Sequence, residues 1–457
     1  MSLLLRKEFR LLLPAWITAL LAATTPLWWY GDLQSMTLVF FGAGILGLAL
    51  SPFGQEIGFG TFGLLLVQPE ERLRFWRIKT SWLALALGSV WFLFNSCMAL
   101  SAMWRGCDLG KYVEITAVMI FLAFSGGLWS TLLLRDTVTA FLCTCLAPLA
   151  IFVLEQGAML VLTHQEPENN FFSPTVYLIE GIYCAAGFFW ARHLFLSAQD
   201  VPWTGGQVYL QGGRTLWPAW LAFRVKKKEN RWIALIKKEL QLQEVVIFLI
   251  PVLAALHVIV LGISHFLKGH TKEWMAMSMP IIWMASVPFL IGCVAVAEER
   301  RLNTLEGLLC MPRLSKRASF ATKLIISLVL GGVLGGAVPP FLENRSIHMH
   351  MDASMAIAVI VTGITFYAST MSKGLLQAIP AAMCIAGLMF GEFALCLKFL
   401  VFEEDQIQLT SFDLLNSLWI PAMACTAILL GYQNYRCPQI SPWMWLRNFL
   451  VASAVYG

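Results

Sequence analysis

The stretch SWLALALGSVWFLFNSCMALSAM, residues 81–103, contains no charged side chain. It is long enough to span a bilayer, because a transmembrane helix needs about 20 mostly apolar residues. Eleven further runs of this kind predict an all-α polytopic membrane protein with about twelve transmembrane helices. Since the second run is short and the fourth and fifth lie close together, a re-entrant hairpin could replace one pair. The twelve candidate spans are 14–30, 36–53, 81–103, 113–133, 138–162, 175–195, 246–267, 275–297, 321–341, 353–371, 375–400 and 412–432.

The composition supports the same class of protein. Hydrophobic residues make up 58% of the 457 residues and charged residues 13%, whereas soluble domains have about 45–50% and about 25%. A soluble protein of this length could not bury so much apolar surface. The formal net charge of +5 needs no nucleic-acid partner, because basic loops beside an anionic leaflet account for it. The expected partner of the apolar surface is the lipid bilayer.

The lysines and arginines predict the orientation of the chain. If the N-terminus is cytoplasmic, 26 of the 32 basic residues fall in cytoplasmic segments and 6 in external ones. Basic residues concentrate on the cytoplasmic side of membrane proteins. We therefore expect a protein of the bacterial cytoplasmic membrane with both termini in the cytoplasm.

Three short motifs recur in the same order along the chain, which indicates an internal repeat. The sequence LLLRKEF at 3–9 reappears as ALIKKEL at 234–240, and the stretch from Glu56 to Pro69 reappears from Glu299 to Pro312. A weaker match relates 130–135 to 369–373, each at the turn before the fifth span of its half. The matching residues are mainly charged or turn-forming, so shared apolarity does not explain them.

The repeat predicts two pseudo-symmetric six-helix halves with parallel topology. Such halves are related by an axis along the membrane normal, and a transport pathway would lie near their interface. The predicted divisions are a first repeat at 1–198, a cytoplasmic linker at 199–232, a second repeat at 233–440, and a terminal anchor or the start of a further span at 441–457.

Motifs for catalysis or cofactor binding are missing from the sequence. There is no GxxxxGK[ST] for ATP and no HExxH or paired CxxC for a metal. The run GFGTFG at 58–63 matches GxGxxG, but it follows a membrane span rather than a strand. We therefore expect no enzyme activity, no bound cofactor and no metal in this chain.

The second motif is the strongest functional signal, because it predicts a short helix in the cytoplasmic loop between the second and third spans of each half. Such a helix, stopped by proline and flanked by basic residues, suits docking to two copies of a cytosolic protein. An ordinary interfacial loop is the alternative. The candidate docking residues are Glu56, Thr61, Gly63, Pro69, Glu299, Thr304, Glu306, Gly307 and Pro312.

Two carboxylates at corresponding positions, Glu155 and Glu392, lie inside predicted spans. Carboxylates in spans are costly and tend to face a cavity or a partner, so these are candidates for a transport pathway. The alternative is a structural role near the outer ends of the spans, with Glu392 pairing Lys398.

At these residues the sequence resembles the permeases of type-2 ATP-binding-cassette (ABC) transporters. These begin with a basic amphipathic helix, similar to 3–10 and 232–243, and carry a coupling helix in the first cytoplasmic loop, similar to 56–69 and 299–312. The resemblance implies an exporter permease whose two halves are fused in one chain. It also implies a separate cytosolic ATPase, present in two copies, that binds ATP and Mg. A twelve-span secondary transporter with two parallel repeats remains the alternative.

Overall fold

The computed structural model describes residues 3–28, 34–67, 71–105, 109–163, 174–198, 231–266, 270–301, 304–309, 316–339, 351–383, 385–386, 420–437 and 441–456. These parts of the chain are helices joined by short turns, and no strand occurs among them. The predicted linker at 199–232 lies outside the described residues except for its last two positions.

The helices of the first half follow the predicted order. They are α1 (Leu3–Ala23), α2 (Thr25–Trp28), α3 (Gln34–Gly58), α4 (Phe62–Val67), α5 (Arg72–Arg105), α6 (Leu109–Leu134), α7 (Thr137–Thr163) and α8 (Pro174–Ser197). The short helix α4 lies in the loop between α3 and α5, where the repeated motif predicts a helix.

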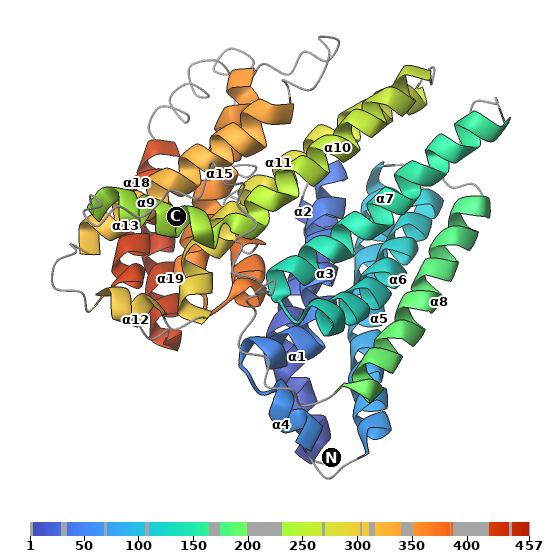
Figure 1. Ribbon diagram of the computed structural model, residues 1–457, viewed down its shortest axis with the longest axis horizontal. Helices are drawn as coiled ribbons and strands as arrows, with labels where there is room; N and C mark the ends of the chain where they lie inside the picture. The colour runs from blue at the N-terminus through green and yellow to red at the C-terminus, as the bar shows by residue number, and fades with distance from the viewer. Residues whose placement is uncertain are drawn as a thin grey trace, which may run out of the picture.

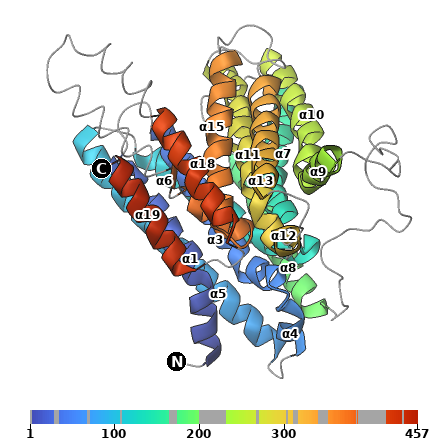
Figure 2. The ribbon, with the colours of Figure 1, turned by 90° about the vertical axis from the view of Figure 1, so that its left-hand side faces the viewer.

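The second half contains a comparable series. Its helices are α9 (Arg231–Leu242), α10 (Glu244–Phe266), α11 (His270–Arg301), α12 (Thr304–Leu309), α13 (Lys316–Leu330) with the π-helical segment η2 (Gly331–Ala337), α15 (Met351–Thr370), a helix at 375–383, and α18 (Ile420–Tyr435). A last helix, α19 (Pro442–Tyr456), lies beside α18 (Figure 2), where Arg447 donates a 2.6 Å hydrogen bond to Asn434.

The described part of the chain is an all-α membrane protein. Seven of its helical stretches are long and apolar enough to cross a bilayer, and 354–370 is a shorter apolar helix. Large apolar side chains point outward from them, such as Phe92 on α5 and Phe121 on α6, as lipid contact requires. The seven stretches are Leu5–Leu27, Thr37–Gly58, Arg72–Met103, Tyr112–Leu134, Thr137–Glu155, Glu244–Ile263 and Lys316–Ala337.

One detail of the predicted elements differs from the structure. The basic segment at 3–10 is not a separate helix, because α1 runs without a break into the first span. Its counterpart α9 is separate, since the chain turns at Gln243, whose side-chain amide donates to the Ile291 carbonyl. The close spacing of the fourth and fifth spans reflects a two-residue turn, Arg135–Asp136, between two long helices.

The two halves pack side by side, with α10 of the second half next to α7 of the first (Figure 1). A buried apolar cluster crosses the boundary between them. It contains Leu50 of α3 and Phe141 of α7 from the first half, and Leu290 of α11 and Ile379 from the second. Lipid tails are as apolar as these side chains, so helices in a bilayer are held together by close van der Waals packing. The packing of this cluster therefore joins the two halves.

The segment η2 packs unusually close to its neighbours because its sequence, GGVLGGA, is rich in glycine. A Cβ atom on Gly336 would lie 2.6 Å from the Cα atom of Met355 in α15, and one on Gly331 would lie 2.0 Å from the Thr362 hydroxyl. Only glycine permits this approach of the third span to α15.

Candidate functional site: two buried lysine–carboxylate clusters

A buried ion cluster lies where the start of α1, the end of α3 and the start of α5 meet. The Lys79 ammonium of α5 lies 2.8 Å from the Glu8 carboxylate of α1 and 3.2 Å from that of Glu56 near the end of α3. Lys79 also donates to the Pro52 carbonyl at 3.0 Å, and Lys7 pairs with Glu56 at 3.1 Å. The side chains of Lys79, Glu8 and Glu56 are at most 1% exposed.

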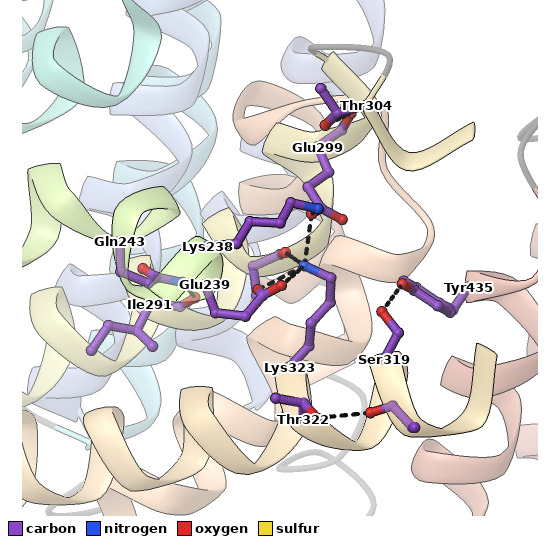
Figure 3. A network of polar contacts seen from close by, with 12 residues as sticks. Lys238, Glu239, Gln243, Ile291, Glu299, Thr304, Ser319, Thr322, Lys323 and Tyr435 are labelled. Carbon is purple, nitrogen blue, oxygen red and sulfur yellow. Dashed lines mark hydrogen bonds and ion pairs between the residues drawn. The ribbon is translucent and has the colours of Figure 1, made fainter. Parts of the chain in front are cut away.

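The second half holds a cluster of the same composition (Figure 3). Lys323 of α13 donates to both carboxylate oxygens of Glu239 on α9 at 2.7 Å and lies 3.0 Å from Glu299 near the end of α11. Lys238 pairs with Glu299 at 2.5 Å, and Lys323 lies 3.4 Å from the Ala295 carbonyl. We name the two sites the Lys79 cluster and the Lys323 cluster.

The two clusters correspond contact by contact. In each, a lysine of the third span meets one glutamate of the first motif and one of the second, and a neighbouring lysine, Lys7 or Lys238, pairs with the latter. The backbone carbonyls that receive the central lysines, Pro52 and Ala295, are separated by the same 243 positions as Glu56 and Glu299. The repeated motifs therefore converge on one local arrangement that occurs twice.

Each cluster is joined directly to its short helix. The Thr61 hydroxyl donates to the Glu56 carbonyl at 3.3 Å, and the Thr304 hydroxyl donates to the Glu299 carbonyl at 3.3 Å. Each threonine stands at or just before the start of a short helix, α4 or α12. The end of the second span and the start of the short helix are thus held to each other through the glutamate that binds the buried lysine.

Electrostatics explain why the residues occur together. A buried ammonium is costly unless it is paired and hydrogen-bonded. Each cluster pairs its two buried glutamates with one buried lysine and with a second lysine, Lys7 or Lys238, that is partly exposed. Burial raises the pKa of Glu239 against the opposing attraction of Lys323. The clusters therefore depend on correct packing of three helices.

The predicted docking residues separate into buried and accessible positions. Glu56 and Glu299 lie inside, at 1% and 0% exposure, so a partner protein cannot touch them directly. Thr61 and Gly63 are half-buried, whereas Thr304 and Glu306 are exposed. Gly307 lies in α12, and Pro69 and Pro312 lie outside the described residues.

The exposed surface beside α4 is apolar. Phe59, just before it, is 58% exposed, and Leu64 within it is 68% exposed. Neither belongs to a candidate span interior, since both lie in the loop between α3 and α5. The short helix α12 instead presents Glu306, which occupies the position of Gly63 in the repeat.

Glu155, a predicted pathway carboxylate, is buried on α7, close to Glu180 of α8 and to Thr175. Among the described residues neither carboxylate forms an ion pair. Glu392 lies outside the described residues. The structure therefore brings Glu155 together with Glu180, which has no counterpart in the repeat.

Two kinds of residue are missed by sequence reasoning. Glu8 and Glu239 occur in the first repeated motif, and Lys79 and Lys323 begin the third spans, but the motifs do not reveal their joint burial. Their identity in the two copies is the available signal. Arg300 gives no such signal, because it occurs in one half only. It is buried and donates to the backbone carbonyls of Thr370, Asn434 and Cys437.

Comparison of the chain with protein families, with characterised proteins and with solved structures finds no match. Within the part of the chain that the structure describes, no group of three or more histidine, cysteine, aspartate or glutamate side chains is arranged to hold a metal ion.

Proposed function

We propose that this chain is the membrane-spanning subunit of an ABC transporter of the type-2 class, with two permease halves fused in one polypeptide. In this proposal the halves are pseudo-symmetric six-span repeats. A separate ATPase dimer docks on the cytoplasmic helices α4 and α12, and ATP hydrolysis in that partner drives export.

The observation that carries the proposal is the matched pair of buried clusters. A lysine that is completely buried between three helices makes those helix ends move together, because separating them would leave unpaired charges. Each cluster ties α1 or α9, the end of the second span and the start of the third span to one short cytoplasmic helix. A displacement of α4 or α12 would therefore be transmitted to three helices at once.

This arrangement suits a transport subunit without its own source of energy. Movement of the docking helices would shift the ends of α3 and α11, which contribute to the apolar cluster between the halves. A change of packing at that boundary would expose a pathway to one side of the membrane and then to the other. A partner that binds the two packings differently would shift the chain from one to the other, and ATP hydrolysis in that partner would drive the cycle.

A twelve-span secondary transporter is the second candidate, and one observation favours it. The buried carboxylates Glu155 and Glu180 lie close together in α7 and α8, and intramembrane carboxylates of this kind bind coupling ions in such carriers. This candidate predicts substrate uptake into vesicles that is driven by an ion gradient in the absence of ATP. It also predicts that Glu155→Gln abolishes that uptake.

The docking proposal is tested by affinity purification of the tagged chain from its native membrane. We expect a P-loop ATPase subunit to co-purify, and the chain alone to hydrolyse no ATP. Leu64→Asp combined with Glu306→Lys should remove the ATPase subunit, because both side chains are exposed on the short helices. Met103→Gln, at an exposed position near the other end of α5, is the control. A complex that survives the double substitution would reject the docking assignment.

A further inference from the structure

An ionic contact crosses from one half of the chain to the other beside the short helices. Arg301, the last residue of α11, lies 3.4 Å from the carboxylate of Asp136, which stands between α6 and α7 in the first half. Glu298 also binds Arg301, and its two carboxylate oxygens accept hydrogen bonds from the Arg301 Nε at 3.0 and 2.9 Å. All three side chains are between 13% and 16% exposed, so the contact is largely sheltered from solvent.

The turn that carries Asp136 also contacts α4. The Arg135 guanidinium lies 5.7 Å from the centre of the Phe62 ring at the start of α4, within the range of a cation–π interaction. Arg135 has φ of +50°, and it is the one non-glycine residue with positive φ in the described part of the chain. The left-handed backbone is unfavourable for arginine, and its contact with Phe62 holds the side chain over α4.

Asp136 also caps a helix, so the effect of its charge can be tested separately from its capping role. Its carboxylate accepts a 2.9 Å hydrogen bond from the backbone N–H of Thr139, so it caps the start of α7. Asparagine caps a helix about as well as aspartate. Replacement of Asp136 by asparagine therefore removes the charge that meets Arg301 and keeps the cap.

The repeat shows that the Arg301–Asp136 contact has no symmetric counterpart at the corresponding positions. The residue that corresponds to Arg301 in the first half is Gly58, 243 positions earlier, and the residue that follows Lys373 in the second turn, as Asp136 follows Arg135 in the first, is Gly374. Two glycines thus occupy the positions where a symmetric chain would repeat the ion pair. The one-sided contact is a feature added to the repeat, not a consequence of it.

We propose that the Arg135–Asp136 turn couples the two short cytoplasmic helices, so that a displacement of α4 is passed to α12 through Phe62, Arg135, Asp136 and Arg301. Arg301 is separated from the start of α12 by two residues, so it can act on that helix directly. The coupling role rests on the proposed function of α4 and α12 as docking helices. In this proposal Arg135 and Asp136 are positioning residues, and they make the two different docking surfaces move together.

The experiment measures hydrogen–deuterium exchange by mass spectrometry on the purified full chain without an ATPase, so its outcome does not depend on whether a partner binds. Phe62→Leu perturbs α4, and exchange is read at 304–309 in α12. We expect this substitution to raise exchange in α12 at least about twofold, the lower end of couplings between contacting residues. In an Asp136→Asn background the same substitution should leave α12 unchanged.

Asp136→Glu, which keeps a carboxylate, should restore part of the response in α12. Lys373→Gln is the matched control, because Lys373 stands in the corresponding turn of the second half and is exposed. Exchange at 137–142 reports whether the cap of α7 is intact. The proposal is overturned if Phe62→Leu does not affect α12, or if its effect on α12 is equal with and without the Asp136→Asn substitution.

Discussion

Loss of a central lysine should strongly weaken the packing of the helix ends in one half of the chain. Lys323→Met tests this expectation most directly. Lys323 is completely buried and lies within 2.7 Å of Glu239 and 3.0 Å of Glu299. The substitution leaves these two carboxylates near each other, with the partly exposed Lys238 still paired to Glu299. Removal of one partner from a buried ion pair costs about 3–5 kcal/mol, which corresponds to a rise of about a hundredfold to several thousandfold in the local opening equilibrium.

The assay is hydrogen–deuterium exchange in α9 and α12, with Lys238→Gln as the control in the same cluster. Lys238 is 34% exposed, and after its loss Glu299 still pairs with Lys323, so this substitution should cost less than the loss of Lys323. Adding Glu239→Leu to Lys323→Met should recover part of the protection, because it removes one of the stranded charges. If Lys323→Met loosens α9 and α12 no more than Lys238→Gln does, the cluster does not hold these helices together.

The described contacts lead to three further predictions. Lys79→Met should loosen α1 and α4 but not α9 and α12, as read by the same exchange measurement, because the two clusters share no residue. Arg300→Met should destabilise the packing of α18 on α15 by about 1–3 kcal/mol for each carbonyl left without a donor, and faster proteolysis near 434–437 would report it. Burial raises the pKa of Glu239 above 4.5, so between these two pKa values the native protein retains a proton that the unfolded chain releases. Thermal stability should therefore fall as the pH rises from 4.5 through the raised pKa. Glu239→Gln should reduce this dependence of thermal stability on pH.

Much of the fold could be predicted from apolar runs, because lipid permits helices to be read from length and composition alone. The short helices α4 and α12 and the long helices on either side of them follow the predicted order. The break at Gln243 agrees with the predicted helix at 232–243. The unbroken path of α1 from 3–10 into the first span could not be predicted, since the two copies of the motif are similar in sequence. The same is true of the glycine-rich segment η2, whose π-helical path depends on its contact with α15.

The sequence pattern identifies residues of the candidate site, but it does not predict how they are arranged in space. The repeat identifies Glu56 and Glu299 as special residues, but their place in a cytoplasmic loop motif suggests exposure. Their burial follows from pairing with Lys79 and Lys323, which lie 23 and 24 positions further along the chain. Periodicity cannot reveal such a contact, because it depends on how three helix ends meet.

The most direct test of the central claim is the mass of the intact assembly, measured by native mass spectrometry after gentle extraction from the native membrane. The account predicts a complex of one 51.0 kDa chain with two P-loop ATPase subunits, and ATP hydrolysis that requires those subunits. A chain that is isolated without an ATPase, and that transports its substrate in vesicles on an ion gradient alone, would contradict the account.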